Sequence, residues 1–271
     1  VVLMAAANKA VDNLILRVVE KARALEELKQ RYRPDRDAVS IVGRCGQDID
    51  PQVAGYEIRS LMRAAGYGKT YMDKDVRRKT RCFLQNCMIH GGTCSAFAQV
   101  PVGQGVGLLD PAIGHGLALV DEAGQVTEPA AYVAFLAQAR CTVHLGDPDQ
   151  LPPFVKSEEA RRCGHHISLL ERLCRSFVGI PFVFLSCQYR MHPDISKVSN
   201  QHIYGNRLQD DPSTGKRDEI GGLPWKNRSR VIWYHVDGLE QADGAAGSAR
   251  SFSNEREAVS YTHLRAHETL Q

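Results

Sequence analysis

Two short apolar segments dominate the middle of the chain, and each of them leads into acidic residues. They cover residues 117–120 and 141–145. Short apolar runs of this kind are typical of strands that are buried on both faces of a parallel sheet. Residues 128–140 lie between the two segments and are long enough for one crossover helix, whose first turn suits Pro129. The pattern therefore predicts a βαβ unit.

Weaker patterns predict elements on either side of this unit. Toward the N-terminus we expect a strand over 1–6, a helix from 8 to about 28, strands over 37–43 and 87–89, and charged helices over 52–90. Residues 103–116 are rich in glycine and predict a surface loop. Toward the C-terminus we expect a helix over 167–173, a strand over 182–185, a helix that begins at His192 and Pro193, and a strand over 231–236.

The composition is that of an ordinary globular protein. At 271 residues, the chain can form one large domain or two small ones. None of its apolar runs approaches the length of a membrane span, and Val1 starts inside an apolar strand without a basic leader. We therefore expect no membrane partner and no visible targeting segment. The net charge of +3 is too small to indicate a nucleic-acid partner by itself.

The cysteines also narrow the class of protein. All eight are scattered, and no two of them form a Cys-x-x-Cys pair. This spacing implies neither a zinc site nor a framework of disulfides. Several cysteines fall in expected strands, which favours reduced thiols in the cytoplasm or the nucleus.

The acidic residues after the two apolar segments are candidates for phosphate chemistry. Carboxyl ends of parallel strands meet at one edge of a sheet, where ligands bind in open α/β folds. There, Asp121 suits a Mg²⁺ ion bound to nucleotide phosphates, and Glu122 suits a role in positioning or deprotonating a water. Gln150 follows Asp147 and suits contact with a γ-phosphate. A lone Asp-Glu pair after a strand is also common in solvated turns. The pair alone therefore does not distinguish a phosphate-binding site from such a turn, and the surrounding residues are needed.

Those surrounding residues form longer strings with a specific resemblance. Asp-Glu-Ala-Gly-Gln at 121–125 and Gly-Asp-x-x-Gln-Leu-Pro-Pro at 146–153 resemble motifs II and III of superfamily 1 helicases, in the senataxin and nonsense-mediated-decay group. Gln-Tyr-Arg-Met-His-Pro at 188–193 matches motif IV of the same group. The resemblance implies an α/β, RecA-like P-loop NTPase fold, a parallel sheet flanked by helices, with ATP and Mg²⁺ as cofactors.

The resemblance also assigns nucleotide contacts in the C-terminal part. The guanidinium of Arg190 can pair bidentately with phosphate oxygens, and across a cleft it would act as an arginine finger. A structural salt bridge is the other reading of Arg190. Tyr189 is expected to be a core residue or a nucleotide contact. Phe252 lies in a segment where the family places an aromatic ring on the adenine.

Single-stranded nucleic acid is the partner that the resemblance implies for the N-terminal part. The string before the first helix resembles motif Ia, although Ala6 and Ala7 replace the family's Pro and Ser. Its donors would be Asn8 and Lys9, at a helix N-terminus. Thr93 and Ser95 lie in a string like the family's Thr-Cys-x-Gly, which touches nucleic acid. Taken alone, these strings would indicate ordinary turns. The basic residues over 74–81, taken alone, would indicate a solvated surface.

The expected organisation is two RecA-like domains. The first covers 1–180, with a helical insertion over about 29–92, and the second begins at 181 and is matched to 259. Residues 260–271 resemble a non-native tail. Residues 66–70 end like a P-loop, but Arg63 stands where a P-loop needs glycine, so we expect a helix end and a turn there.

The function that follows is an ATP-dependent helicase or translocase on single-stranded RNA or DNA, with protein cofactors of RNA decay or processing as further partners. No P-loop precedes motif Ia and no motif V or VI follows motif IV in this sequence, so we expect the chain alone to hydrolyse little or no ATP. One alternative is a non-catalytic nucleic-acid-binding remnant of such a helicase. Another is an unrelated P-loop ATPase, which would lack the hexapeptide at 188–193.

Overall fold

The computed structural model describes residues 1–21, 42–64, 74–99, 101–103, 106–176, 179–216, 230–231, 235–243 and 251–259. The chain divides into two compact units, Val1–Phe182 and Val183–Gln271, which are described separately. The assignment of two RecA-like domains to 1–180 and 181–259 stays a prediction. Several expected features lie outside the described residues: the helix end over 22–28, the parts of the insertion over 29–41 and 65–73 (which include the P-loop-like string at 66–70), and the tail over 260–271.

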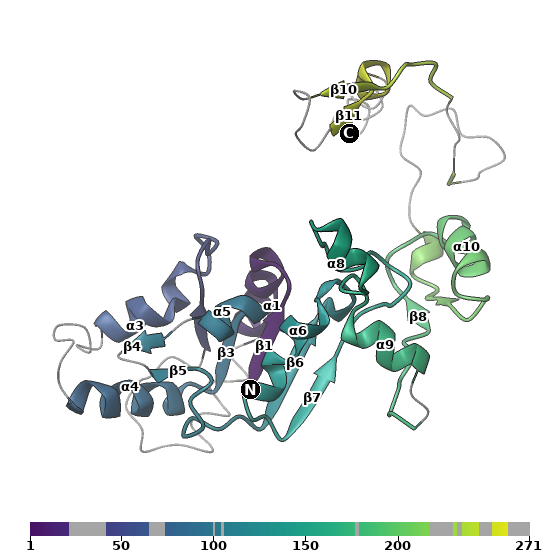
Figure 1. Ribbon diagram of the computed structural model, residues 1–271. Coiled ribbons are helices and arrows are strands. Elements are labelled where there is room, and N and C mark those ends of the chain that lie inside the picture. The colour runs from purple at the N-terminus through teal and green to yellow at the C-terminus, as the bar shows by residue number, and fades with distance from the viewer. Residues whose placement is uncertain are drawn as a thin grey trace. The chain divides into compact units, whose positions relative to one another are not determined.

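The first unit is built on a parallel sheet flanked by helices, as the sequence predicts (Figure 1). The sheet has five strands. The strand order is β2-β3-β1-β6-β7, and every neighbouring pair is parallel. The bounds are β1 (Val2–Ala5), β2 (Val42–Cys45), β3 (Ile89–Thr93), β6 (Leu117–Asp121) and β7 (Cys141–His144). All four residues of the central strand β1 are buried, because helices pack on both faces of the sheet.

Helices and turns fill the connections between these strands. The bounds are α1 (Asn8–Glu20), a 3₁₀ turn η1 (Ala54–Tyr56), α3 (Ile58–Ala64), α4 (Lys74–Asn86), α5 (Cys94–Gln99), a 3₁₀ turn η2 (Ala123–Gln125), α6 (Glu128–Ala131), α7 (Val133–Leu136), α8 (Glu158–Arg162) and α9 (Leu169–Ser176). Helix α1 lies against β1 and β3 on one face and forms a core of Val11 and Ile15 with Val42. A larger core around Met4, Phe97 and Val120 lies on the other face.

Strand β3 corrects the prediction of a strand over 87–89, because it begins at Ile89 and continues to Thr93. Two glycines hid it, since glycine is a poor strand former. A Cβ atom on Gly91 would lie 2.7 Å from Cδ1 of Ile15, and one on Gly92 would lie 2.8 Å from the Phe97 ring. The glycines are there because helices pack closely on both faces of this strand.

Two other expectations for the first unit were wrong in part. Strand β7 was expected to be buried on both faces, but it is the edge strand of the described sheet and its residues alternate between exposed and half-buried. The crossover forms two short helices, α6 and α7, rather than one, although Pro129 does lie in the first turn of α6. The βαβ connection itself is confirmed, since β6 and β7 are parallel neighbours.

The glycine-rich stretch over 103–116 is also more ordered than a surface loop. It takes part in an antiparallel pair, β4 (Pro101–Gly103) with β5 (Val106–Gly107). Leu108 and Ile113 then enter the core, and Asp110 forms an ion pair of 2.7 Å with Arg81 of α4. Turn-forming glycines surround these three anchors, so composition alone did not reveal them.

The second unit contains shorter elements. Its described elements are β8 (Cys187–Gln188), α10 (Pro193–His202), β9 (Gln209–Asp210), a 3₁₀ turn η3 (Thr214–Lys216), β10 (Gln241–Asp243) and β11 (Ser251–Ser253). Helix α10 begins after His192, as predicted, and the His192 ring accepts a hydrogen bond from the Asp194 backbone N–H. The strand expected over 182–185 is absent: Phe182, Val183 and Leu185 are exposed and pair with no strand. Nor do the described residues of 231–236 form a strand.

Candidate functional site

The register of the sheet gathers the predicted site residues of the first unit at one edge. Ala5 of β1 pairs with Thr93 of β3 on one side and with Asp121 of β6 on the other. All three residues end their strands. The loops that follow therefore open at the same carboxyl edge, which is where parallel sheets bind ligands.

Asp121 and Glu122 present two carboxylates at this edge. Asp121 is half-buried, and no donor or cation contacts its carboxylate within the described part of the chain. Glu122 is exposed and adopts φ +49°, a left-handed conformation that is uncommon for a residue with a side chain. Among the described residues, its carboxylate accepts one hydrogen bond, a long one of 3.4 Å from the Gln125 side-chain amide. Half-buried and exposed carboxylate oxygens without a cationic partner suit Mg²⁺.

The loop after β7 lies beside the loop that carries these carboxylates. Asp147 shapes it, because one carboxylate oxygen accepts the Asp149 backbone N–H at 2.9 Å. The other oxygen accepts the Gln150 side-chain amide at 3.0 Å. Asp149 in turn is paired with Arg175 of α9 at 3.3 Å. Asp147 thus fixes the loop and holds Gln150, whose side chain is exposed.

The loops after β6 and β7 run backbone against backbone. The Ala123 N–H donates to the Leu145 carbonyl at 2.8 Å, and the Leu145 N–H donates to the Val120 carbonyl at 2.8 Å. A Cβ atom on Gly124 would lie 2.7 Å from the Asp147 carbonyl oxygen, and one on Gly146 would lie 2.9 Å from the Ala123 nitrogen. Only glycine fits at either position without moving a backbone.

A Gly146→Ala substitution is therefore expected to lower the free energy of unfolding by about 1–3 kcal/mol, the usual cost of overpacking. The measurement is urea denaturation. Gly116→Ala is the matched control, because a Cβ atom there meets nothing within 4 Å. Equal stability of the two variants would mean that the two loops do not approach each other as described.

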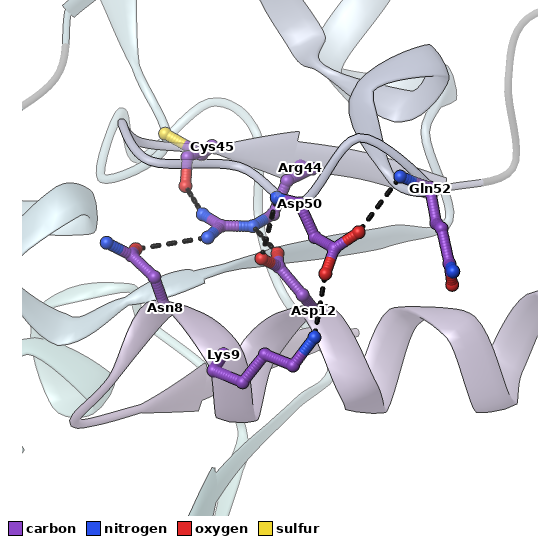
Figure 2. Close-up of polar contacts among 7 residues, drawn as sticks. All are labelled: Asn8, Lys9, Asp12, Arg44, Cys45, Asp50 and Gln52. Atoms are coloured by element: carbon purple, nitrogen blue, oxygen red, sulfur yellow. Dashed lines mark hydrogen bonds and ion pairs between the residues drawn. The ribbon is translucent and has the colours of Figure 1, made fainter.

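The predicted nucleic-acid loop before α1 is held by buried charges (Figure 2). Arg44 is fully buried and donates from Nε to Asp12 at 2.6 Å and from Nη2 to the Asn8 side-chain oxygen at 3.0 Å. Lys9, by contrast, is exposed and forms an ion pair of 2.7 Å with Asp50. Asn8 and Lys9 thus each have a partner from the β2 strand or the loop after it.

Thr93 and Ser95 lie at the same edge, at the start of α5. The Thr93 hydroxyl accepts a hydrogen bond of 3.1 Å from the Ala96 backbone N–H, as a helix cap does. The Ser95 side chain is exposed. Ser95 is therefore the more accessible of the two predicted contacts.

In the second unit, the hexapeptide at 188–193 is folded into a turn by the Gln188 side chain. Its oxygen accepts the backbone N–H groups of Arg190 and Met191, at 2.9 and 2.8 Å. Its nitrogen donates to the Met191 carbonyl and to the Asp210 carboxylate, at 2.7 and 2.6 Å. Tyr189 and Arg190 point outward from this turn, and the reading of Tyr189 as a core residue was wrong, since 65% of it is exposed.

The structure brings together only part of the predicted site. Seven of its residues lie at the carboxyl edge of one sheet, either at the end of a strand, in the loop after it or in the first residues of the helix that follows: Asn8, Lys9, Thr93, Ser95, Asp121, Glu122 and Gln150. Tyr189, Arg190 and Phe252 belong to the second unit, so their place on the same nucleotide stays a prediction. Phe252 lies in β11, and its side chain is outside the described residues.

Three residues that organise the site were not predicted from the sequence: Asp12, Arg44 and Gln188. Asp12 and Asn8 lie one helical turn apart and so face the same side of α1, a signal that the sequence does contain. Arg44 is a single charged residue in an otherwise apolar strand, which is a second signal. Nothing in the sequence distinguishes Gln188 from its neighbours in the hexapeptide.

His90 is a further buried polar residue, in the middle of β3. Its ring is 2% exposed and meets the His115 ring edge-on, with centroids 5.3 Å apart. Neither His90 ring nitrogen has a hydrogen-bond partner of ordinary geometry among the described residues. Burial, reinforced by His115, lowers the pKa of His90 from 6.5 to about 3, and the Leu84 backbone opposes this only in part.

The fold is therefore expected to lose stability in mild acid. Between the folded pKa of about 3 and the unfolded value of 6.5, only the unfolded chain binds a proton at His90. Lowering the pH from 7.5 to 5.5 should then remove about 1.4 kcal/mol of unfolding free energy through His90, measured by urea denaturation at both values. His90→Leu should reduce this pH dependence and His202→Gln, on exposed α10 surface, should not. An unchanged pH dependence in His90→Leu would contradict the assignment.

Comparison with known proteins places these features in a family. Two family profiles, each described as an AAA domain, match residues 57–158 and 165–267. The first match contains the strings at 121–125 and 146–153, and the second contains the hexapeptide at 188–193. None of the helices in the described ranges is long and apolar enough to cross a membrane.

Three curated relatives show the same likeness. A regulator of nonsense transcripts 1 homolog of Drosophila melanogaster is 35% identical over 52% of this chain and 12% of its own length. The 5'-3' DNA helicase ZGRF1 of Mus musculus is 31% identical over 70% of this chain and 10% of its own length. Helicase sen1 of Schizosaccharomyces pombe is 25% identical over 72% of this chain and 11% of its own length.

The chain thus spans about a tenth of the length of these relatives. Its parallel sheet, flanked by helices on both faces, is the α/β architecture of a RecA-like helicase domain. Since the helicase-like strings fall inside both matched regions, the chain belongs to the superfamily 1 helicases of the senataxin and nonsense-mediated-decay group.

Proposed function

We propose that the protein carrying this chain couples ATP hydrolysis to movement along single-stranded RNA or DNA. The observation that carries the proposal is the pair of carboxylates, Asp121 and Glu122, at the carboxyl edge of β6. Neither has a cationic partner among the described residues, and the adjoining loop presents Gln150. This arrangement fits Mg²⁺ and a nucleoside triphosphate better than it fits a structural ion pair.

Each residue has a distinct role in this proposal. Asp121 would hold Mg²⁺, which would neutralise charge on the β- and γ-phosphates when bound. Glu122 would accept a proton from the attacking water through its carboxylate. Gln150, whose side-chain amide is oriented by Asp147, would donate a hydrogen bond to a γ-phosphate oxygen. Arg190, in the turn held by Gln188, would stabilise charge that develops on the transferred phosphoryl group.

The nucleic acid would run along the same edge of the first unit. Asn8 and Lys9 at the start of α1, with Thr93 and Ser95 at the start of α5, would contact its backbone. Because contacts of this kind go to phosphates, binding should be independent of sequence and should weaken as salt rises. The proposed location is the cytoplasm or the nucleus, with protein cofactors of RNA decay or processing as partners, in line with the relative named a regulator of nonsense transcripts.

The test uses the intact protein that carries this chain. ATP hydrolysis is measured with and without single-stranded RNA and DNA, and strand displacement is followed on matched RNA and DNA duplexes with single-stranded tails. The proposal expects hydrolysis that nucleic acid stimulates and strand separation that requires ATP. Tight binding of nucleic acid without hydrolysis would instead support the non-catalytic binding alternative.

A further inference from the structure

The Arg44 side chain is a full positive charge inside the first unit. It has no exposed surface, and its neighbours are one carboxylate and two neutral oxygens. Nε donates to Asp12, Nη1 to the Cys45 carbonyl and Nη2 to the Asn8 side-chain oxygen (Figure 2). Burying such a pair has a desolvation cost that an apolar pair of similar volume would avoid. Stability alone therefore does not explain why an arginine occupies this position.

What the arginine does determine is the orientation of the Asn8 amide. A guanidinium can only donate hydrogen bonds, so Asn8 has to turn its oxygen toward Arg44. Figure 2 shows the consequence: the Asn8 nitrogen points away from the buried pair. Within the described residues, no group accepts a hydrogen bond from that nitrogen. The side chain thus offers its surroundings a donor and no acceptor.

The same cluster fixes the neighbouring lysine. The second oxygen of Asp12 accepts the Asp50 backbone N–H at 3.0 Å. Asp50 then pairs with Lys9 at 2.7 Å and also accepts the Gln52 backbone N–H at 3.0 Å. Asp12 therefore neutralises Arg44 and ties down the loop that holds Lys9. The two consecutive residues at the start of α1 are both set by one buried ion pair.

We propose that Arg44 is a positioning residue for nucleic-acid binding, which holds the Asn8 amide so that its nitrogen donates to a phosphate oxygen of the single strand. The inference rests on the proposed function, because it needs nucleic acid at this edge. Phosphate oxygens only accept hydrogen bonds, so an asparagine locked in the donor orientation suits them and an unlocked one would spend part of its time presenting its oxygen.

The sharpest test is Asn8→Asp in the intact protein. The carboxylate can still accept the hydrogen bond from Arg44, so the fold should keep its stability, but the outward donor becomes an acceptor with negative charge. The dissociation constant for fluorescently labelled single-stranded oligonucleotides (U-rich RNA and T-rich DNA) is measured by anisotropy. We expect binding to weaken about tenfold or more. Asn13→Asp is the matched control, since it makes the same change at an exposed position of the same helix and should alter binding little.

A double-mutant cycle separates positioning from a merely structural role. Arg44→Lys keeps a cation beside Asp12 but loses the geometry that locks Asn8. We expect Asn8→Ala and Arg44→Lys each to weaken binding about fivefold, and Arg44→Lys to add less than about twofold in the Asn8→Ala background. Equal effects of Arg44→Lys in both backgrounds would overturn the positioning role. If Arg44→Lys fails to fold, the comparison of Asn8→Asp with Asn13→Asp still tests the inference, because equal binding by these two variants would mean that the Asn8 amide gives Arg44 nothing to position.

The outcomes also distinguish this inference from the proposed function. Wild-type protein that binds neither oligonucleotide would overturn both. Wild-type protein that binds and hydrolyses ATP, with an unaffected Asn8→Asp variant, would overturn the inference and leave the proposed function standing. Weakened binding by Asn8→Asp with normal binding by Asn13→Asp supports both.

Discussion

Replacing Asp12 with alanine should lower the free energy of unfolding by about 3–5 kcal/mol, because Arg44 would stay buried without a counter-charge. The two side chains are 2.6 Å apart and almost completely inaccessible, so water cannot take the place of the lost carboxylate. The measurement is denaturant unfolding at neutral pH. Lys9→Met is the control: it breaks an ion pair to the same loop, but that pair is exposed, so we expect no measurable loss.

A second variant shows whether the loss comes from the uncompensated charge. Removing both charges, with Asp12→Leu and Arg44→Met together, should recover most of the stability, since well-packed apolar pairs often replace buried ion pairs without cost. A double variant as unstable as Asp12→Ala would mean that the hydrogen bonds to Asn8, Cys45 and Asp50 carry the stability instead. In that case the ion pair would not be the element that holds this edge together.

The carboxyl edge could be predicted from the sequence because it depends on local patterns. The apolar runs over 117–120 and 141–145 mark parallel strands, and the residue after such a strand has to lie at the edge. The position of Asp121, Glu122 and Gln150 at this edge therefore follows from the sequence. Thr93 was located by motif alone, since Gly91 and Gly92 concealed the strand that carries it.

What the sequence did not reveal are contacts between distant residues. Arg44 and Asp12 belong to different elements, and only the packing of α1 beside β2 brings them together. Strand β7 was predicted, but its exposure was not, for a related reason: an apolar run predicts burial, but the number of neighbours that a strand has is a property of the whole sheet. The prediction of a strand over 182–185 was wrong for the same reason, because an apolar run that has no partner strand does not form part of a sheet.

Glu122→Gln should reduce the turnover number for nucleic-acid-stimulated ATP hydrolysis about 10²–10⁴-fold in the intact protein, the range that general-base catalysis supplies. The amide keeps the size and the polarity of the side chain, and it can keep the backbone conformation at φ +49°. It cannot accept a proton from the attacking water. Binding of ATP and of nucleic acid should therefore survive, so that the loss appears in the turnover number and not in the affinity for either ligand.

The matched control for Glu122→Gln is Glu158→Gln, an equally conservative change at an exposed position of α8. If both variants hydrolyse ATP at rates within a few-fold of the wild type, Glu122 is not the base, and the carboxylate pair at the end of β6 acts through Asp121 alone. If Glu122→Gln loses nucleotide affinity as strongly as turnover, its carboxylate belongs to the metal site instead. Because Asp121 and Glu122 are adjacent in sequence but differ in burial and backbone conformation, the two kinetic patterns assign their roles separately.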